Sequence, residues 1–187
     1  MIEKKEIDQE YKYGFSDGDN SILNTNKGLS VDVIKKISSI KNEPEWMLNL
    51  RLKAYEKFLE TPNPTWGADL SNINYDDIIY YTTSSKKMES YWEKVPQQIK
   101  ETFEKLGIPE AEAKFLNGVS AQYDSETVYK KLEEELEQKG VIFTNIETAI
   151  LKYPELVKKY FGKLVPYDDN KFAMLNTAVW SGGSFIY

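Results

Sequence analysis

The side chains that could carry chemistry in this sequence are carboxylates, Lys, Tyr and the hydroxyls of Ser and Thr, because its 187 residues include no Cys and no His. Thiolates are the usual ligands of iron–sulfur clusters and of structural zinc, so this chain cannot supply them. A Ser-His or Cys-His nucleophile pair is excluded for the same reason. We therefore expect no catalytic residue, no cofactor-binding residue and no metal ligand here, and we do not expect an enzyme.

Two compact groups of carboxylates lie in stretches that we expect to be loops, Asp76–Asp77 and Asp168–Asp169 with Asn170. Carboxylate and amide oxygens could hold a hard cation such as Mg²⁺ or Ca²⁺. Neither group has the regular spacing of a calcium loop, and Asp or Asn before a helix is commonly an N-cap. Glu43 and Glu45 flank Pro44 at an expected helix start, where the helix dipole favours negative charge.

Arg51 is the most unusual charged residue, because it falls between two apolar stripes of one expected helix. Such a charge either forms a structural ion pair or contacts a ligand or partner. Aromatic side chains could similarly form a stacking platform or fill the core. The candidates are Trp46, Trp66, Tyr80, Tyr81, Tyr91, Trp92 and Trp180. Gly182–Gly183 lacks the Lys and the strand-to-helix setting of a phosphate loop, so we expect a turn there.

The overall composition limits the classes of partner. The formal net charge is −6, and Lys and Glu are interspersed, so no basic stripe for nucleic acid is present. No apolar run reaches the length of about 18 residues that a membrane span needs. The charged start of the chain is not followed by the apolar core of a secretory signal. We expect no nucleic-acid partner, no membrane insertion and a cytoplasmic location, with which the lack of Cys is compatible.

Helical spacing and helix-end signals dominate the pattern. Ser30 is a candidate N-cap, and Pro44 suits the first position of a helix ending near Glu60. In that helix Trp46, Leu50, Ala54 and Phe58 form one apolar stripe, and Leu48, Leu52, Tyr55 and Leu59 form a second, so we expect it to touch more than one neighbour. Further helices are expected over 96–106, from 109, over 126–139, 146–152, 154–161 and 170–179.

Short strands are expected between these helices. Alternation and β-branched residues indicate extended segments over 78–83, 119–123, 141–144 and 184–187. The fold class is therefore α+β, mostly α-helical with a few short strands. We expect a loosely ordered N-terminal arm over 1–29 and a helical domain over 30–165. The apolar strand over 185–187 has no charge or Pro to protect its edge, which indicates continuation into a sheet.

Three stretches resemble the SufB family of iron–sulfur cluster scaffold proteins. The first is similar to the family pattern NEPEWM-x-x-x-RL-x-AY and comprises Asn42–Leu48, Arg51–Leu52 and Ala54–Tyr55. The second comprises Pro154–Val157, Lys159–Tyr160, Gly162, Val165–Pro166 and Asp169–Asn170. The third comprises Leu175–Asn176, Ala178–Val179 and Ser181–Tyr187. The resemblance extends from about residue 10 to the end of the chain.

This resemblance implies a scaffold that assembles nascent iron–sulfur clusters with the ATPase SufC and the paralogue SufD. It implies an N-terminal helical region, a central right-handed parallel β-helix, here truncated and beginning within 166–187, and a C-terminal part that binds SufC. The family's cluster ligands are expected beyond Tyr187, so the cluster is implied for the full-length protein only. A free-standing helical interaction module without catalytic activity is the main alternative, and a carboxylate-dependent metal enzyme is a third.

Overall fold

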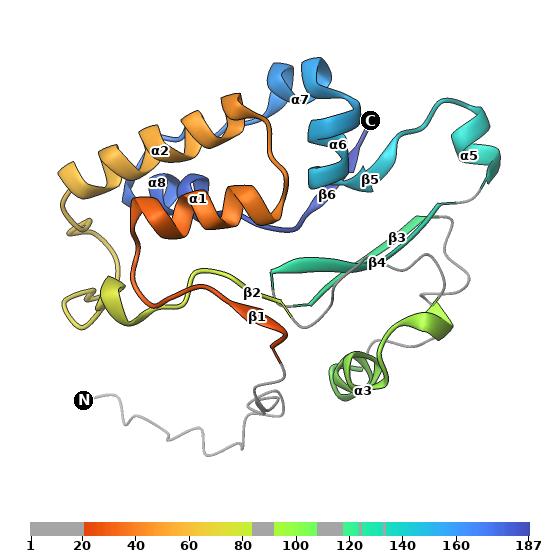
Figure 1. Cartoon of the computed structure of the whole chain (residues 1–187), viewed down its shortest axis with the longest axis horizontal. Helices are drawn as coiled ribbons and strands as arrows, with labels where there is room; N and C mark the ends of the chain where they lie inside the picture. Colours follow the sequence, from red (N-terminus) through yellow and green to blue (C-terminus); the bar gives the residue numbers. More distant parts are fainter. Residues whose placement is uncertain (1–20, 84–91, 108–117, 124, 133) are drawn as a thin grey trace, which may run out of the picture.

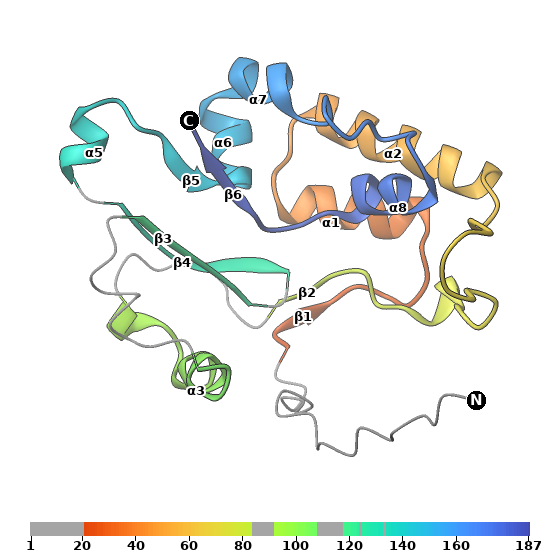
Figure 2. The same ribbon diagram turned by 180° about the vertical axis from the view of Figure 1, so that it is seen from behind.

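Two consecutive helices from the first third of the sequence pack side by side with a third helix from near its end, and buried residues of all three meet in one core cluster. The computed structural model describes residues 21–83, 92–107, 118–123, 125–132 and 134–187. Helices α1 (Val31–Ile40) and α8 (Lys171–Val179) both pack against the long α2 (Glu45–Glu60), as Figures 1 and 2 show from opposite sides. Helices α6 (Ile146–Lys152) and α7 (Pro154–Tyr160) lie beside one end of α2.

The strands described form three separate two-stranded antiparallel sheets. Strand β1 (Leu23–Asn24) pairs with β2 (Thr82–Thr83), β3 (Gly118–Tyr123) with β4 (Glu126–Leu132), and β5 (Phe143–Asn145) with β6 (Ser184–Ile186). The remaining elements are the short helices η1 (Tyr75–Asp77), η2 (Trp92–Lys94), α3 (Gln97–Lys105) and α5 (Glu134–Gln138). Within the described part of the chain no helix has the length and apolarity to cross a membrane.

Side-chain caps explain where the main helices begin. Ser30 Oγ accepts a hydrogen bond from the Val33 backbone at 3.2 Å, which satisfies an otherwise unpaired N–H of the first turn of α1. Asn170 Oδ1 accepts from the backbone N–H groups of Phe172 and Ala173 at 2.9 and 3.1 Å at the start of α8. The expected Ser30 cap is confirmed. Pro44 is the N-cap of α2 and not its first helical residue.

The two apolar stripes expected on α2 do contact different neighbours. Trp46 and Leu50 of the first stripe pack against a buried cluster of Met47 with residues of α6 and α7. Leu48, Leu52 and Tyr55 of the second stripe pack against a cluster in which Ala54 meets Ile34 of α1 and Ala178 of α8. The two small Ala side chains let the backbones of α2 and α8 approach closely. Leu59 is an exception to the expected pattern, because 64% of it is exposed.

The expected helix over 126–139 is wrong for its first half. Residues 126–132 form strand β4, and only 134–138 are helical. Strand β4 pairs with β3 from Glu126 opposite Tyr123 to Leu132 opposite Gly118, with one register shift between Ala121 and Gln122. Glu126 and Lys130 have the i,i+4 spacing of a helical ion pair, but such a pair contributes only about 0.2–0.5 kcal/mol to a helix. The Thr and Tyr residues within 126–132 favour a strand, and tertiary pairing decides the outcome.

Other expected boundaries need smaller changes. The strand expected over 141–144 lies at Phe143–Asn145, and the one over 78–83 is reduced to Thr82–Thr83 with an isolated bridge between Lys27 and Ile79. The expected helix from Pro109 lies outside the described residues. Strand β1 falls within the stretch expected to be a loose arm, and the division of the chain into three regions remains a prediction. The described strands all pair antiparallel, so the described residues show no parallel β-helix, and the expected entry into one within 166–187 stays a prediction.

Candidate functional site

Arg51 lies at the centre of a buried polar cluster between α2, α8 and the α1–α2 connection. Its Nε donates to Glu43 Oε2 at 2.8 Å and its Nη2 to Glu43 Oε1 at 2.6 Å, so the ion pair is bidentate. The same guanidinium donates to the backbone oxygens of Ala178 at 3.1 Å and Trp180 at 2.9 Å. The side chains of Arg51 and Glu43 are only 0% and 2% exposed. The structural ion pair expected for Arg51 is confirmed, and direct contact with an external ligand is excluded by burial.

This cluster, which we call the Arg51 clasp, satisfies the C-terminal end of α8. The last carbonyls of a helix have no intrahelical partners and carry partial negative charge. Ala178 is in the last turn of α8, and Trp180 follows it as the C-cap residue. The Trp180 ring also stacks on the guanidinium, with the Arg51 Cζ 4.5 Å from its centroid. Arg51 therefore joins α2 and the α1–α2 connection to the end of α8, which lies 127 positions later at Ala178.

A second buried ion pair holds the segment that leads into β6. Lys41 Nζ donates to Glu147 Oε1 at 2.8 Å, and their side chains are 2% and 12% exposed. The same Glu147 oxygen accepts from the backbone N–H of Gly182 at 2.8 Å. Gly182 has φ +68, a conformation that favours Gly. The expected turn at Gly182–Gly183 is thus anchored by Glu147, a contact that no local pattern in the sequence indicated.

The two carboxylate groups weighed as cation ligands are not assembled into such a site. Asp76 and Asp77 lie on η1 and are exposed, and Asn74 both caps η1 and donates to Asp77 Oδ2 at 2.6 Å. Asp168 and Asp169 are exposed just before the Asn170 cap. In the described ranges no group of three or more Asp, Glu, Cys or His side chains is placed to hold a metal ion. The absence of a metal site in the chain stays a prediction.

The aromatic residues weighed as a stacking platform are dispersed, and four of them pack into the core. Trp46 and Trp180 pack against the Met47 cluster, and Tyr80 and Tyr81 belong to the cluster of Val33 and Ile37. Trp66 is 71% exposed in the loop after α2. The side chains of Tyr91 and Trp92 lie outside what the structure describes.

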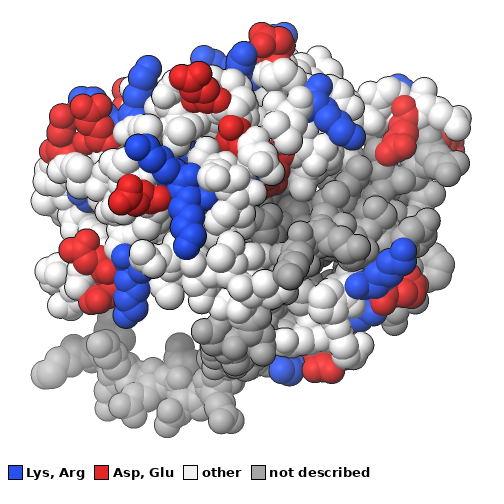
Figure 3. Space-filling model, viewed as in Figure 1, with Lys and Arg blue, Asp and Glu red and all other residues white. Residues whose placement is uncertain are grey.

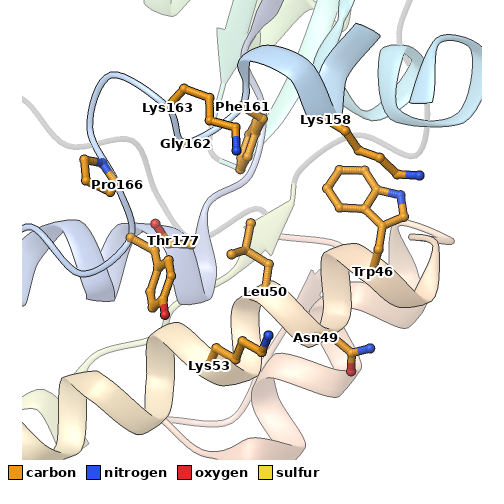
Figure 4. A pocket seen from close by; sticks show the side chains of 11 residues that line it. Trp46, Asn49, Leu50, Lys53, Lys158, Phe161, Gly162, Lys163, Pro166 and Thr177 are labelled. Atoms are coloured by element: carbon orange, nitrogen blue, oxygen red, sulfur yellow. The ribbon is translucent and has the colours of Figure 1, made fainter. Parts of the chain in front are cut away.

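An open groove of about 690 Å³ lies between α2 and the connection from α7 to α8. Figure 4 shows Trp46 and Leu50 on one side and Phe161 and Pro166 on the other. The charged side chains that line it are Lys53, Lys158 and Lys163. We call this feature the lysine groove.

The phenol of Tyr80 should make the stability of the fold depend on pH, which tests how Tyr80 packs between strand β2 and η1. Burial raises the pKa of Tyr80 to about 12, with smaller contributions from Tyr75 and Asp76. An unfolded chain releases the phenol proton near pH 10, so the folded state binds more protons between about pH 10 and 12. Stability should therefore fall as the pH rises through this window.

Urea unfolding midpoints measured from about pH 9 to 12 test this expectation. The midpoint should fall less steeply with pH for Tyr80→Phe than for the wild type. Tyr153→Phe, which alters an exposed ring, should retain the wild-type slope. Equal slopes for all three proteins would contradict this assignment.

The fold and its two buried ion pairs define a mainly helical α+β region in which the buried charges join distant segments. Comparison with known families gives a match over residues 33–187 to the family described as SufBD protein, N-terminal region. An iron-sulfur cluster assembly SufBD family protein of Staphylococcus aureus is 57% identical over 178 residues, covering 95% of this chain. A protein of the same description from Staphylococcus haemolyticus is 56% identical over 178 residues, again covering 95% of this chain.

The chain belongs to the SufBD family. It spans 38% of the length of these staphylococcal relatives. The family resemblance carried by the sequence motifs is thereby confirmed at the level of SufBD proteins. The Arg51 clasp draws on the same motifs, since Glu43 and Arg51 come from the first and Ala178 from the third.

Proposed function

We propose that this chain is the N-terminal region of SufB, the scaffold subunit of cytoplasmic iron–sulfur cluster assembly, and that it contributes shape and no catalysis. The family match over residues 33–187 carries the proposal, because the curated relatives are described as iron–sulfur cluster assembly proteins. The choice of SufB over SufD rests on the pattern NEPEWM-x-x-x-RL-x-AY, which resembles SufB. The non-catalytic role rests on the lack of Cys and His and on the burial of Arg51 and Glu43.

In the full-length protein this region would precede a right-handed parallel β-helix and act with the ATPase SufC and with SufD. The proposal rests on the family resemblance and on the share of the staphylococcal relatives that this chain spans, which is 38% of their length. Cluster ligands would come from outside these residues, because thiolate or imidazole ligands are absent from them. The expected result is that the 187-residue chain holds no cofactor of its own.

Anaerobic reconstitution with ferrous iron and sulfide tests the division of roles. The 187-residue chain should show no stoichiometric visible absorption band after desalting, whereas the full-length protein should show one. The chain alone should also not bind SufC tightly by calorimetry. A stoichiometric chromophore on the chain, or a sub-micromolar complex with SufC, would count against the proposal.

Genetic replacement separates SufB from SufD. The full-length gene should restore the activity of iron–sulfur enzymes in a strain depleted of SufB and not in one depleted of SufD. The reverse pattern would mean that the chain belongs to SufD, which is still within the SufBD family. The alternative, a free-standing interaction module, requires that neither depletion is rescued and that the gene is not adjacent to genes for an ATP-binding-cassette ATPase and a cysteine desulfurase.

A further inference from the structure

The lysine groove has a charge opposite to that of the chain as a whole. The formal net charge is −6, and on the face drawn in Figure 3 acidic and basic side chains lie interspersed. The charged residues that line the groove, by contrast, are all lysines: Lys53, Lys158 and Lys163. Lys158 pairs with Glu155 at 2.8 Å across an exposed helix face. Among the described residues Lys53 and Lys163 have no carboxylate partner, so a ligand that complements the groove carries negative charge.

The floor of the groove is apolar. Leu50 projects into its centre with Lys163 and Lys53 on either side, and the Trp46 ring forms one wall (Figure 4). The volume of about 690 Å³ lies within the range of ligand-binding clefts, roughly 300–1,000 Å³. An apolar side chain can be buried here while acidic groups reach the lysines at the rim.

The apolar surface extends beyond the groove, which favours a polypeptide over a small molecule. Lys163 and Pro166 line the groove, and between them Leu164 and Val165 are 98% and 62% exposed. Together with the groove they extend one apolar surface, and extended apolar surfaces with a polar rim mark protein–protein interaction sites. A small ligand in the groove would leave them in water, whereas a bound segment could cover the groove and this loop together.

From this arrangement we infer that the lysine groove and the adjoining Leu164–Val165 loop form a docking site for a partner protein, through an acidic segment with a bulky apolar side chain. The apolar side chain packs on Leu50 and Trp46, and its flanking carboxylates pair with Lys53 and Lys163. The inference does not depend on whether the chain is part of SufB or SufD.

A labelled peptide tests the site in the full-length protein that carries these residues. The probe is a fluorescein-labelled decapeptide with a Leu-Phe centre flanked by glutamates, and its matched control has glutamines in place of the glutamates. Fluorescence anisotropy should show binding of the acidic peptide only, and the affinity should fall as the salt concentration rises. The double variant Lys53→Gln/Lys163→Gln should bind roughly tenfold more weakly, as expected for two exposed ion pairs.

Two further variants complete the set. Glu155→Gln removes the carboxylate that competes for Lys158 and should tighten binding about twofold, within the range for one exposed pair. Lys139→Gln removes an exposed lysine on another part of the chain and should leave binding unchanged. Thermal unfolding of each variant shows whether the fold is retained.

Four results would overturn the inference. The first is no binding even at about 1 mM peptide, a concentration that would reveal a binding free energy as weak as about −4 kcal/mol. The second is equal binding of the acidic and the glutamine peptide. The third is that a thiol introduced by Leu164→Cys is protected from a labelling reagent in the full-length protein without any partner, which would mean that the protein's own remaining residues cover the site. The fourth is a dimer in sedimentation that the double Lys variant abolishes, which would assign the groove to a second copy.

Discussion

Replacing Arg51 with Met is expected to lower the free energy of unfolding of the chain by about 3–5 kcal/mol, because Glu43 would remain buried without its counter-charge. The carbonyls of Ala178 and Trp180 would also lose their donor. The Met side chain fills much of the apolar volume of Arg, so most of the loss comes from unpaired polar groups. Urea unfolding monitored by far-ultraviolet circular dichroism measures the change.

The chain provides a matched control for this substitution. Lys139 and Glu135 form an ion pair with the same 2.6 Å separation as Arg51 and Glu43, but their side chains are 64% and 76% exposed. Lys139→Met should cost no more than about 0.5 kcal/mol, as exposed i,i+4 pairs do. If the two variants lose equal stability, burial is not what makes the Arg51 clasp important.

A second substitution separates the charge from the geometry. Adding Glu43→Leu to Arg51→Met removes the unpaired carboxylate and should recover part of the lost stability, since apolar replacement of a whole buried pair is often tolerated. Full recovery is not expected, because the two carbonyls at the end of α8 still lack a donor. Arg51→Lys should be intermediate, because a single ammonium cannot reproduce the bidentate contact.

The helix ends could be predicted from the sequence because their signals are local. Ser30 and Asn170 cap their helices through side-chain contacts within three residues, and such contacts follow from residue type and spacing. The strand at 126–132 was not predictable in the same way. Its pattern is compatible with a helix, and only pairing with β3 decides between the two structures.

The polar site was predicted in part. The position of Arg51 between two apolar stripes indicated a buried charge, but its partner was not evident. Glu43 could be explained fully by the helix dipole at the start of α2, and nothing local indicated that it turns inward to Arg51. Lys41 and Glu147 are separated by 106 positions, so their pairing needs the tertiary fold. The family resemblance adds information that local patterns lack, because the motif that contains Arg51 also contains its partner Glu43.

Replacing Lys41 with Met should lower the free energy of unfolding by about 3 kcal/mol, near the lower end for a broken buried pair, because Glu147 is partly accessible. The carboxylate would keep only its contact with the Gly182 N–H, and its Oε2 already has no hydrogen-bond partner among the described residues. Urea unfolding gives the loss in stability.

The same substitution has a local consequence that distinguishes it from a general loss of stability. Glu147 fixes Gly182, and the next residues lead into β6, where Tyr187 and Ile142 exchange backbone hydrogen bonds of 2.8 and 2.9 Å. Hydrogen exchange of the Tyr187 amide should therefore accelerate more in Lys41→Met than in Arg51→Met, relative to amides in the centre of α2. Adding Glu147→Gln should restore slow exchange, because a neutral amide can still accept from Gly182 without a buried charge. If exchange at Tyr187 follows global stability alone in both variants, the Lys41–Glu147 pair stabilises the fold without specifically positioning β6.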